Sequence, residues 1–378
     1  MHIGLITTEY PISGTGAYGG IGTSMKNMAL GLVSQNVKVS VFLISQKLGK
    51  VIEEDGVTVY FIEQLKYPVL SWFFYKKHVQ HYINKIIQSE RIDAIEAPDW
   101  SGITAFMSFK CPLVLRFHGT DAYFCELEGR KQKFKNYWLE KFALNGADHF
   151  VSVSEFTAVR TRQLFKLQSK ITIIPNAVNL DYFVPEKEEE EPLQILYFGT
   201  LIRKKGVLDL IEIFNQVVEK LPEIKLYLAG VDTRDIKTAR STKELMMERL
   251  SLKAKKQTIF LGKLEYALMR SEIAKATVIA LPSYAEALPM TWIEAMAMEK
   301  ALVTSDIGWA NEVMVEGETG FTVSPDNHNF YAQRLVEFLI SPELRREMGL
   351  KARSRVKAKF SQEVIAQLNL NFYQGIID

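Results

Sequence analysis

Apolar runs of strand length alternate with helical patterns along the whole chain, and this alternation limits the fold more than any other feature. In the first half, strands are predicted at residues 2–6, 37–44, 57–62, 93–97, 112–117, 149–153 and 171–175. The pattern restarts with strands predicted at residues 194–199, 224–230, 258–262, 277–281, 301–305 and 320–323. Strands that alternate with helices form parallel sheets with crossover helices, so the predicted fold class is α/β.

A proline-bounded acidic run, VPEKEEEEP at residues 184–192, separates the two series of strands. Such a run is typical of a solvated linker between domains. We therefore predict a Rossmann-like N-terminal domain at residues 1–183 and a Rossmann-like C-terminal domain at residues 193–360. Residues 361–378 are predicted to form a terminal helix that packs back on the N-terminal domain.

Composition excludes several classes of protein. The chain has 378 residues, of which 47% are hydrophobic and 24% charged, as in soluble globular proteins. A net charge of +2 gives no case for a nucleic-acid partner. Cys111 and Cys125 have no zinc-ligand spacing, so we expect no bound metal and a reducing, cytoplasmic location. No apolar run reaches the roughly 20 residues that cross a bilayer.

The stretch LPSYAEALPMTWIEAMAMEK, residues 281–300, carries the strongest functional signal. A buried strand leads into a turn with Glu286, and a helix predicted from Pro289 is apolar on every side except Glu294. Burying a carboxylate without a partner costs several kcal/mol, so we expect a ligand to supply partners. Backbone N–H groups at the helix N-terminus, from Leu288, Met290 and Thr291, suit a phosphate. Carboxylates for hydroxyls beside an anion site suit a sugar nucleotide. The alternative is structural, with Glu286 capping the helix or lying in solvent and Glu294 paired to a neighbouring lysine.

The same stretch, followed by GWANEVMVEGETGFTV, resembles the donor site of the retaining glycosyltransferases of family GT4, which have the GT-B fold. In that family two glutamates stand eight positions apart, as Glu286 and Glu294 do here. The resemblance implies two Rossmann-like domains that face each other across a cleft. Ala287 occupies a place where the family often has glycine, so the loop of amides can differ in shape.

Polar groups at the ends of strands in the first half match further family elements. The loop GGIG supplies Gly19, Gly20 and Gly22, which by the resemblance lie near the donor phosphate and the acceptor. RFHGTD supplies His118, which the resemblance places against the transferred sugar, and Asp121, which helps position that sugar or the acceptor. Asp99 and Trp100 also follow a strand. A carboxylate beside an aromatic face commonly holds a sugar, and a simple packed turn is the alternative.

The turn GTLIRKKG, residues 199–206, precedes a helix and offers cations for an anion. Lys205 matches the family's lysine, whereas Thr200 stands where the family has arginine, and we expect Arg203 to supply that second charge. Gly262 and Leu264 end a strand in a turn that, in the family, flanks the nucleotide base.

Together with the resemblance, these residues predict a hexosyltransferase (EC 2.4), and the family implies that it works with retention and without a metal. It would move a sugar with retention from a nucleoside-diphosphate donor, most simply a UDP- or GDP-sugar, to a hydroxyl of a glycan or lipid-linked acceptor. Glu294 would bind the ribose, Glu286 the transferred sugar, and Lys205 with Arg203 the diphosphate. No cofactor is expected. Two alternatives stay open, namely a sugar-nucleotide epimerase and a non-catalytic sugar-nucleotide-binding subunit.

Residues 65–85, LKYPVLSWFFYKKHVQHYINK, interleave aromatic and basic side chains, and the pattern recurs in part at residues 122–141. A basic aromatic helix can lie on a membrane interface, which would place the protein at the inner face of the membrane. An ordinary helix that packs its aromatics on the sheet is the favoured alternative.

Overall fold

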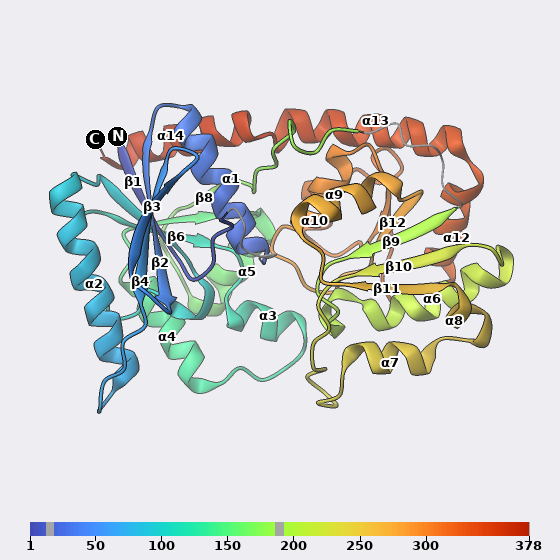
Figure 1. The fold of residues 1–378 in the computed structure, drawn as a ribbon, viewed down its shortest axis with the longest axis horizontal. Helices are drawn as coiled ribbons and strands as arrows, with labels where there is room; N and C mark the ends of the chain where they lie inside the picture. The colour runs from blue at the N-terminus through green and yellow to red at the C-terminus, as the bar shows by residue number, and fades with distance from the viewer. Residues whose placement is uncertain (13–18, 186–192, 378) are drawn as a thin grey trace. The chain divides into compact units, whose positions relative to one another are not determined.

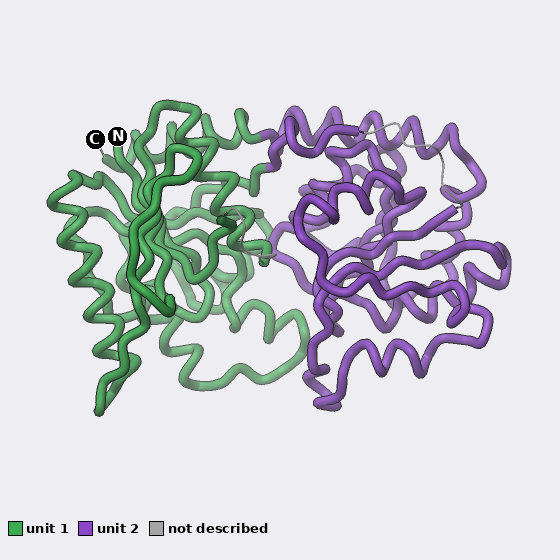
Figure 2. The backbone as a smooth tube through the Cα atoms, viewed as in Figure 1, with its two compact units in different colours: residues 1–177, 362–378 green, residues 178–361 purple. Residues whose placement is uncertain are grey.

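The computed structural model describes residues 1–12, 19–185 and 193–377, and the chain divides into two compact units (Figures 1 and 2). Unit 1 comprises residues 1–177 and 362–378, and unit 2 comprises residues 178–361. Of the predicted linker at residues 184–192, residues 186–192 lie outside the described part of the chain.

Unit 1 is built on an eight-stranded sheet, all parallel except for the antiparallel pair of β3 and β4. Its strands in spatial order are β3 (Lys50–Glu54), β4 (Val57–Glu63), β2 (Lys38–Gln46), β1 (His2–Thr7), β5 (Ala94–Pro98), β6 (Leu113–Phe117), β7 (His149–Ser152) and β8 (Ile171–Ile173). Order reverses beside β1, since β2 lies on one side of it and β5 on the other. Ligands of open α/β sheets bind outside the carboxyl ends of strands at such a reversal.

Two hydrophobic cores cover the faces of this sheet because successive side chains of a strand point to opposite faces. In β2, Val39, Val41 and Leu43 enter one core, whereas Phe42 and Ile44 enter the other. The first core is completed by α1 (Gly20–Ser34) and α14 (Gln362–Ile377), which pack on each other. The second is completed by α2 (Ser71–Glu90), α4 (Phe134–Asn145) and α5 (Glu155–Phe165). The short α3 (Asp121–Leu127) follows β6.

Unit 2 is built on a six-stranded parallel sheet. Its strands in spatial order are β11 (Thr258–Gly262), β10 (Lys225–Ala229), β9 (Gln194–Phe198), β12 (Val278–Leu281), β13 (Ala301–Thr304) and β14 (Phe321–Thr322). The order again reverses at the first strand of the unit, with β10 and β12 on either side of β9.

Helices of unit 2 pack in two groups. The first contains α6 (Val207–Lys220), α7 (Thr242–Arg249), α8 (Leu252–Gln257) and α12 (His328–Ile340). Val207, Leu210, Ile211, Phe214 and Val218 of α6 are buried at helical spacing, so that one face of α6 joins the core. The second group contains α9 (Tyr266–Lys275), α10 (Met290–Ala297) and α13 (Pro342–Lys359), and α11 (Ala310–Val313) follows β13.

The structure confirms the α/β fold class and a strand at every predicted run. It adds β3, which the sequence did not reveal because this edge strand, KVIEE, is short, has only two apolar residues and is largely exposed. Across the described residues, no helix is both long and apolar enough to span a membrane.

Candidate active site

The carboxyl ends of three strands of unit 2, β9, β10 and β12, lie close together because glycines stand where their backbones touch. Gly206 is the N-cap of α6 with φ +69°, and a Cβ there would lie 1.8 Å from the carbonyl oxygen of Pro282. A Cβ on Gly230 would likewise lie 1.8 Å from the carbonyl oxygen of Gly199. Any side chain at these positions would force the strand ends of β9, β10 and β12 apart. The turn after β9 is further tied to the loop after β12, since the Tyr284 N–H donates to the Lys204 carbonyl across 2.8 Å.

This packing brings two of the predicted site residues together. Lys205 closes the turn after β9, and its Nζ donates to Oε1 of Glu286 in the loop after β12. Glu286 is buried, whereas the Lys205 side chain is 22% exposed. An ammonium group and a buried carboxylate therefore lie side by side at the carboxyl ends of the neighbouring strands β9 and β12.

Arg203, predicted to be the second cation, is held by a carboxylate that the sequence did not single out. Its Nε and Nη2 donate to the two oxygens of Asp235 across 2.7 and 3.0 Å. Asp235 also accepts from the backbone and hydroxyl of Thr238, and the hydrogen bonds from Arg203 and Thr238 lower the pKa of Asp235. The guanidinium is thus fixed in direction by the loop after β10.

Glu294 lies on α10 with its carboxylate buried, as the sequence predicted. Tyr266 of α9 donates its hydroxyl to Glu294 Oε1 across 2.9 Å, so the protein itself supplies one partner. Burial raises the pKa of Glu294 to about 7, against the smaller opposing effect of the Tyr266 hydrogen bond. The carboxylate is therefore poised between its neutral and ionised forms at neutral pH.

The start of α10 differs in one respect from the prediction. Pro289 is the N-cap rather than the first helical residue, with φ −72° and ψ 113°, and the helix begins at Met290. A proline has no N–H to lose at either position, so the sequence did not distinguish them. Leu288 and Met290 are buried, and Thr291 is half-buried.

The remaining predicted donor residues of unit 2 lie at strand ends. Thr200 is exposed directly after β9, and its carbonyl accepts the Tyr197 hydroxyl across 2.9 Å. Gly262 ends β11 with φ +70°, and its carbonyl accepts the Gly230 N–H across 2.8 Å. Leu264, two residues later, is half-buried.

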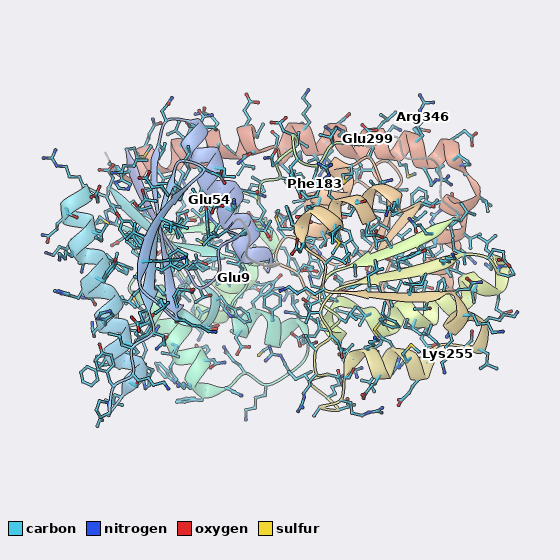
Figure 3. All side chains as sticks on the ribbon, viewed as in Figure 1. Glu9, Glu54, Phe183, Lys255, Glu299 and Arg346 are labelled. Carbon is cyan, nitrogen blue, oxygen red and sulfur yellow. The ribbon has the colours of Figure 1, made fainter. Side chains whose placement is uncertain are left out.

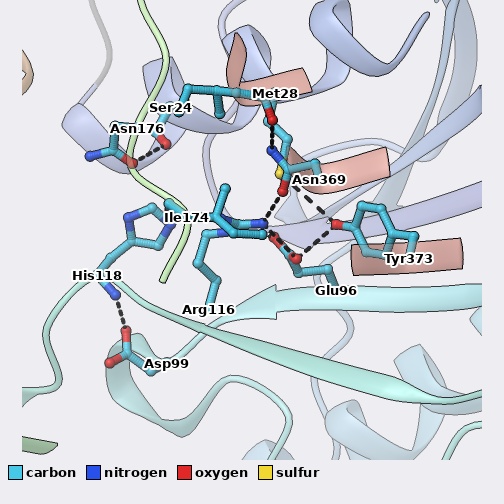
Figure 4. Close-up of polar contacts among 11 residues, drawn as sticks. Ser24, Met28, Glu96, Asp99, Arg116, His118, Ile174, Asn176, Asn369 and Tyr373 are labelled. Atoms are coloured by element: carbon cyan, nitrogen blue, oxygen red, sulfur yellow. Dashed lines mark hydrogen bonds and ion pairs between the residues drawn. The ribbon is translucent and has the colours of Figure 1, made fainter. Parts of the chain in front are cut away.

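In unit 1, the predicted residues His118 and Asp99 are in direct contact (Figure 4). His118 follows β6, and its backbone N–H donates to Asp99 Oδ1 across 2.9 Å. The next residue, Gly119, has φ +93°, a conformation that favours glycine, and a Cβ there would lie 2.7 Å from Phe124. The hydrogen bond to Asp99 and the close packing of Gly119 on Phe124 therefore hold the backbone on either side of the His118 side chain.

Two buried polar atoms of this contact have no hydrogen-bond partner among the described residues, namely Nε2 of His118 after β6 and Oδ2 of Asp99 after β5. Burial, with the nearby positive charge of Arg116, lowers the pKa of His118 to about 3. Burial also raises the pKa of Asp99 well above its usual range. A neutral imidazole with an unpartnered nitrogen can exchange a hydrogen bond with a ligand hydroxyl, and a buried orphan of this kind costs stability until a ligand arrives.

A buried ionic network lies beside His118 (Figure 4). Arg116 of β6 donates to both oxygens of Glu96 of β5 across 2.6 and 3.0 Å. Helix α14 completes the network, since Asn369 Oδ1 accepts from Arg116 and the Tyr373 hydroxyl donates to Glu96. The C-terminal helix thereby holds the strand that leads to His118.

Asp121 lies at the start of α3, where its carboxylate accepts from Arg130 across 3.0 Å and from Asn136 across 2.9 Å. Burial alone would raise the pKa of Asp121, but the hydrogen bonds from Asn136 and Arg130 outweigh burial and lower it. The Asp121 N–H donates to the buried Glu140 across 2.6 Å. Trp100 is 39% exposed, and its ring packs edge-on against Phe124 at 6.0 Å.

The glycines of the first loop lie at the N-terminus of α1, which begins at Gly20. The carboxylate of Glu9, labelled in Figure 3, accepts the N–H groups of Gly19 and Gly22 across 3.3 and 3.1 Å. A Cβ on Gly19 would lie 2.8 Å from that carboxylate. Gly14 and Gly16 precede these glycines in a glycine-rich stretch of the sequence, and both lie outside the described residues.

The residues that sequence reasoning missed are mostly partners of residues that it found. They are Glu9, Asp235 and Tyr266, together with the network of Glu96 and Arg116. No local sequence pattern predicts the roles of Tyr266 and Asp235, because each contacts a partner on a different element. Glu96 and Arg116 carried a readable signal, since each is a charge inside an apolar strand and such charges need a partner.

Comparison with known proteins gives a consistent family. The family model Glycosyltransferase Family 4 matches residues 18–182, and the model Glycosyl transferases group 1 matches residues 180–355. An uncharacterised glycosyltransferase of Methanocaldococcus jannaschii is 24% identical, over 99% of this chain and 98% of the relative. A GDP-mannose-dependent phosphatidylinositol monomannoside mannosyltransferase of Corynebacterium glutamicum is 23% identical, over 82% of this chain and 85% of the relative.

Solved structures show the same fold. Sucrose-phosphate synthase from Thermosynechococcus elongatus aligns with a TM-score of 0.81 at 20% identity, over 99% of this chain and 98% of that one. TarM of Staphylococcus aureus aligns with a TM-score of 0.75 at 12% identity, over 98% of this chain and 99% of that one. The two family models adjoin and leave only the ends of the chain unmatched, so the chain belongs to the glycosyl transferases group 1, the GT-B enzymes of glycosyltransferase family 4.

Proposed function

We propose that this glycosyltransferase (EC 2.4) moves a hexosyl group from a UDP- or GDP-sugar to a hydroxyl of a glycan or lipid-linked acceptor, with retention and without a metal ion. The observation that carries the proposal is the pairing of Lys205 with the buried Glu286 on the segment that also carries Glu294. The family establishes the transfer from a nucleotide sugar. The choice of sugar, acceptor, stereochemistry and catalytic residues is our proposal.

The donor residues of unit 2 receive roles from their chemistry. Glu294 accepts hydrogen bonds from the ribose, and Glu286 accepts them from hydroxyls of the transferred sugar. Each such bond to a charged acceptor contributes about 1.5–3 kcal/mol. Lys205 exchanges part of its contact with Glu286 for the departing phosphate, where negative charge develops. Arg203, aimed by Asp235, adds a second positive charge.

Peptide groups complete the proposed donor site. N–H groups near the start of α10, at Leu288, Met290 and Thr291 beside Pro289, face the diphosphate, as does Thr200. Gly262 and Leu264 flank the base. In unit 1, Gly20 and Gly22 are assigned to the donor phosphate and Gly19 to the acceptor. The N–H groups of Gly19 and Gly22 donate to Glu9, so a ligand would have to displace this carboxylate.

His118 and its neighbours act on the sugars. The neutral imidazole of His118 exchanges a hydrogen bond with a hydroxyl of the donor sugar through Nε2, which has no partner among the described residues. Asp99 holds the backbone of His118, and Trp100 offers an exposed ring to the acceptor. Asp121 orders the same loop through Arg130 and Asn136.

The names of related proteins support the substrate classes. They include a GDP-mannose-dependent mannosyltransferase that acts on a phosphatidylinositol monomannoside, a capsular polysaccharide glycosyltransferase, and a solved homologue that binds UDP and glucose. Both cysteines are free thiols, which suits our proposal of a reducing, cytoplasmic location.

The test is a panel of UDP-, GDP- and ADP-sugars with and without EDTA, followed by NMR of the anomeric centre of the product. We expect one donor to release its nucleoside diphosphate with EDTA present and with the donor's anomeric configuration kept. An inverted product or an absolute need for Mg²⁺ would contradict the proposal. Conversion of the sugar nucleotide without release of nucleoside diphosphate would indicate an epimerase instead.

A further inference from the structure

Eight aromatic rings form a continuous row on the surface of unit 1. They come from residues 67–74 at and just before the start of α2, from Phe106 and from α4. We call this row the aromatic ladder, and its members are Tyr67, Trp72, Phe73, Phe74, Phe106, Phe134, Trp138 and Phe142. Each ring lies within 6 Å of the next, from 4.7 Å between Phe106 and Phe142 to 5.9 Å between Tyr67 and Phe74. The ladder therefore joins two helices that are about 60 residues apart in sequence.

The ladder is exposed to an extent that folding alone does not explain. Phe134 is 77% exposed, and Trp72, Phe74, Trp138 and Phe142 each keep more than a third of their surface in water. Val69 and Leu70, just before α2, are 67% and 57% exposed. A contiguous apolar patch of this kind marks an interaction surface on a soluble protein.

The face of α2 that serves the core is a different one. Tyr75, Val79, Ile83 and Ile87 are the buried residues of that helix. In α4, Phe134, Trp138 and Phe142 are spaced four residues apart and so share one face, whereas Ala143 and Leu144 are buried. The packing of aromatics on the sheet, which the sequence favoured for residues 65–85, thus holds for Tyr75 but not for Trp72 or Phe74.

Cations outnumber carboxylates around the ladder. Residues 64–77 and 129–139 contain Lys66, Lys76, Lys77, Arg130, Lys131, Lys133 and Lys135 without a single Asp or Glu. Arg130 is paired with Asp121 and Glu128, and Lys76 and Lys77 donate to backbone carbonyls. Lys66, Lys131, Lys133 and Lys135 are exposed and carry the remaining positive charge. Lys135 Nζ lies 5.6 Å from the Trp72 ring, and Lys141 Nζ lies 5.1 Å from the Trp138 ring. The surface is therefore apolar in the middle and positive at its border.

We propose that the aromatic ladder and its lysine border dock on an anionic lipid bilayer. The Trp and Phe rings would enter the boundary between headgroups and acyl chains, which aromatic side chains favour. The lysines would lie at the phosphates, which attract positively charged side chains near the membrane surface. A protein partner fits less well, because protein interfaces are depleted in lysine. The surface deepens the proposed function by bringing a lipid-linked acceptor to the enzyme, but it does not depend on catalysis.

The experiment is flotation of the full chain with vesicles of phosphatidylcholine, alone and with phosphatidylglycerol added. The test variants are Phe134→Ser with Trp138→Ser, and Lys131→Glu with Lys133→Glu. The matched control is Leu252→Ser with Ile340→Ser, since both side chains are well exposed and belong to unit 2, which contains no member of the ladder. Tryptophan fluorescence with added vesicles reports insertion independently of flotation.

We expect the wild-type chain and the control to float with the anionic vesicles only, and to be released by high salt. Each test variant should lose at least about tenfold in vesicle affinity, equivalent to 1.4 kcal/mol. Flotation that is absent, or equal in all the variants, would overturn the proposal. Self-association that Phe134→Ser abolishes, without flotation, would assign the surface to a second copy and overturn it as well.

Nucleotide affinity separates this proposal from the proposed function. The ladder variants should bind the nucleotide as the wild-type chain does. Loss of flotation with intact nucleotide binding supports the docking surface alone. Intact flotation with no binding of any nucleotide would leave the docking surface standing and remove the donor assignment.

Discussion

Asp99 Oδ1 accepts the backbone N–H of His118 across 2.9 Å, while Asp99 Oδ2 and His118 Nε2 are both buried without a partner in the described chain. One hydrogen bond thus fixes the loop, and two further polar atoms remain available to a ligand. Because burial raises the pKa of Asp99, its carboxyl group is favoured in the neutral form. A neutral carboxylic acid resembles an amide in shape and polarity, so replacing Asp99 by asparagine should preserve its hydrogen bond to His118.

We predict that Asp99→Asn keeps most of the activity, because the amide oxygen can still accept the His118 N–H. Asp99→Ala should lower kcat/KM by about 10- to 100-fold, since a buried donor is then left unsatisfied. Nucleotide affinity should change little in either variant. Steady-state kinetics and calorimetry measure both quantities, and equal losses in the two variants would contradict this role for the hydrogen bond.

Because Arg116 and Glu96 form a buried ion pair, we expect removal of one partner to destabilise the fold more than replacement of both. Arg116→Met alone leaves a buried carboxylate without its cation and should cost about 3–5 kcal/mol. The double variant, Arg116→Met with Glu96→Gln, should recover much of that loss. Calorimetric unfolding of the three proteins at one pH measures the effect. If the double variant is as unstable as the single one, the loss comes from packing rather than from the unpaired charge.

Glu294 predicts a pH dependence of stability. Its pKa is raised to about 7 in the fold from an ordinary value of 4.5, so the unfolded chain loses this proton first. Stability from this group is fully present below pH 4.5 and is lost as the pH rises to about 7, by roughly 3 kcal/mol in total. Glu294→Gln should therefore gain melting temperature relative to the wild-type chain between pH 5 and about pH 8. A constant difference across that range would show that Glu294 does not titrate there.

The variant Lys205→Ala tests whether this lysine stabilises the departing nucleoside diphosphate. We predict that Lys205→Ala lowers kcat by about 100- to 1,000-fold and weakens binding of the nucleoside diphosphate by less than tenfold. The reason is that the cation is needed most where charge develops in the transition state. Lys237→Ala, an exposed lysine of the same unit, is the matched control. A loss of nucleotide affinity as large as the loss of kcat would reduce Lys205 to a simple binding residue.

The sequence predicted the backbone better than the partnerships of the side chains. Runs such as residues 278–281 are apolar on both faces, as buried parallel strands must be, and each formed a strand. The burial of Glu294 could be predicted because local periodicity places it on an apolar helix. Its partner Tyr266, and the Asp235 that holds Arg203, could not, because those contacts depend on tertiary packing between separate elements. The start of α10 was one residue off because proline suits both positions.

The central claim is that Glu294 and Lys205 belong to a donor site that needs no metal. Calorimetric titration of UDP, GDP and ADP into the wild-type chain and Glu294→Ala, each with EDTA, tests it most directly. We predict that one nucleotide binds the wild-type chain without metal and that Glu294→Ala weakens it by at least about tenfold. Binding by none of the three, or equal binding by both proteins, would contradict the account.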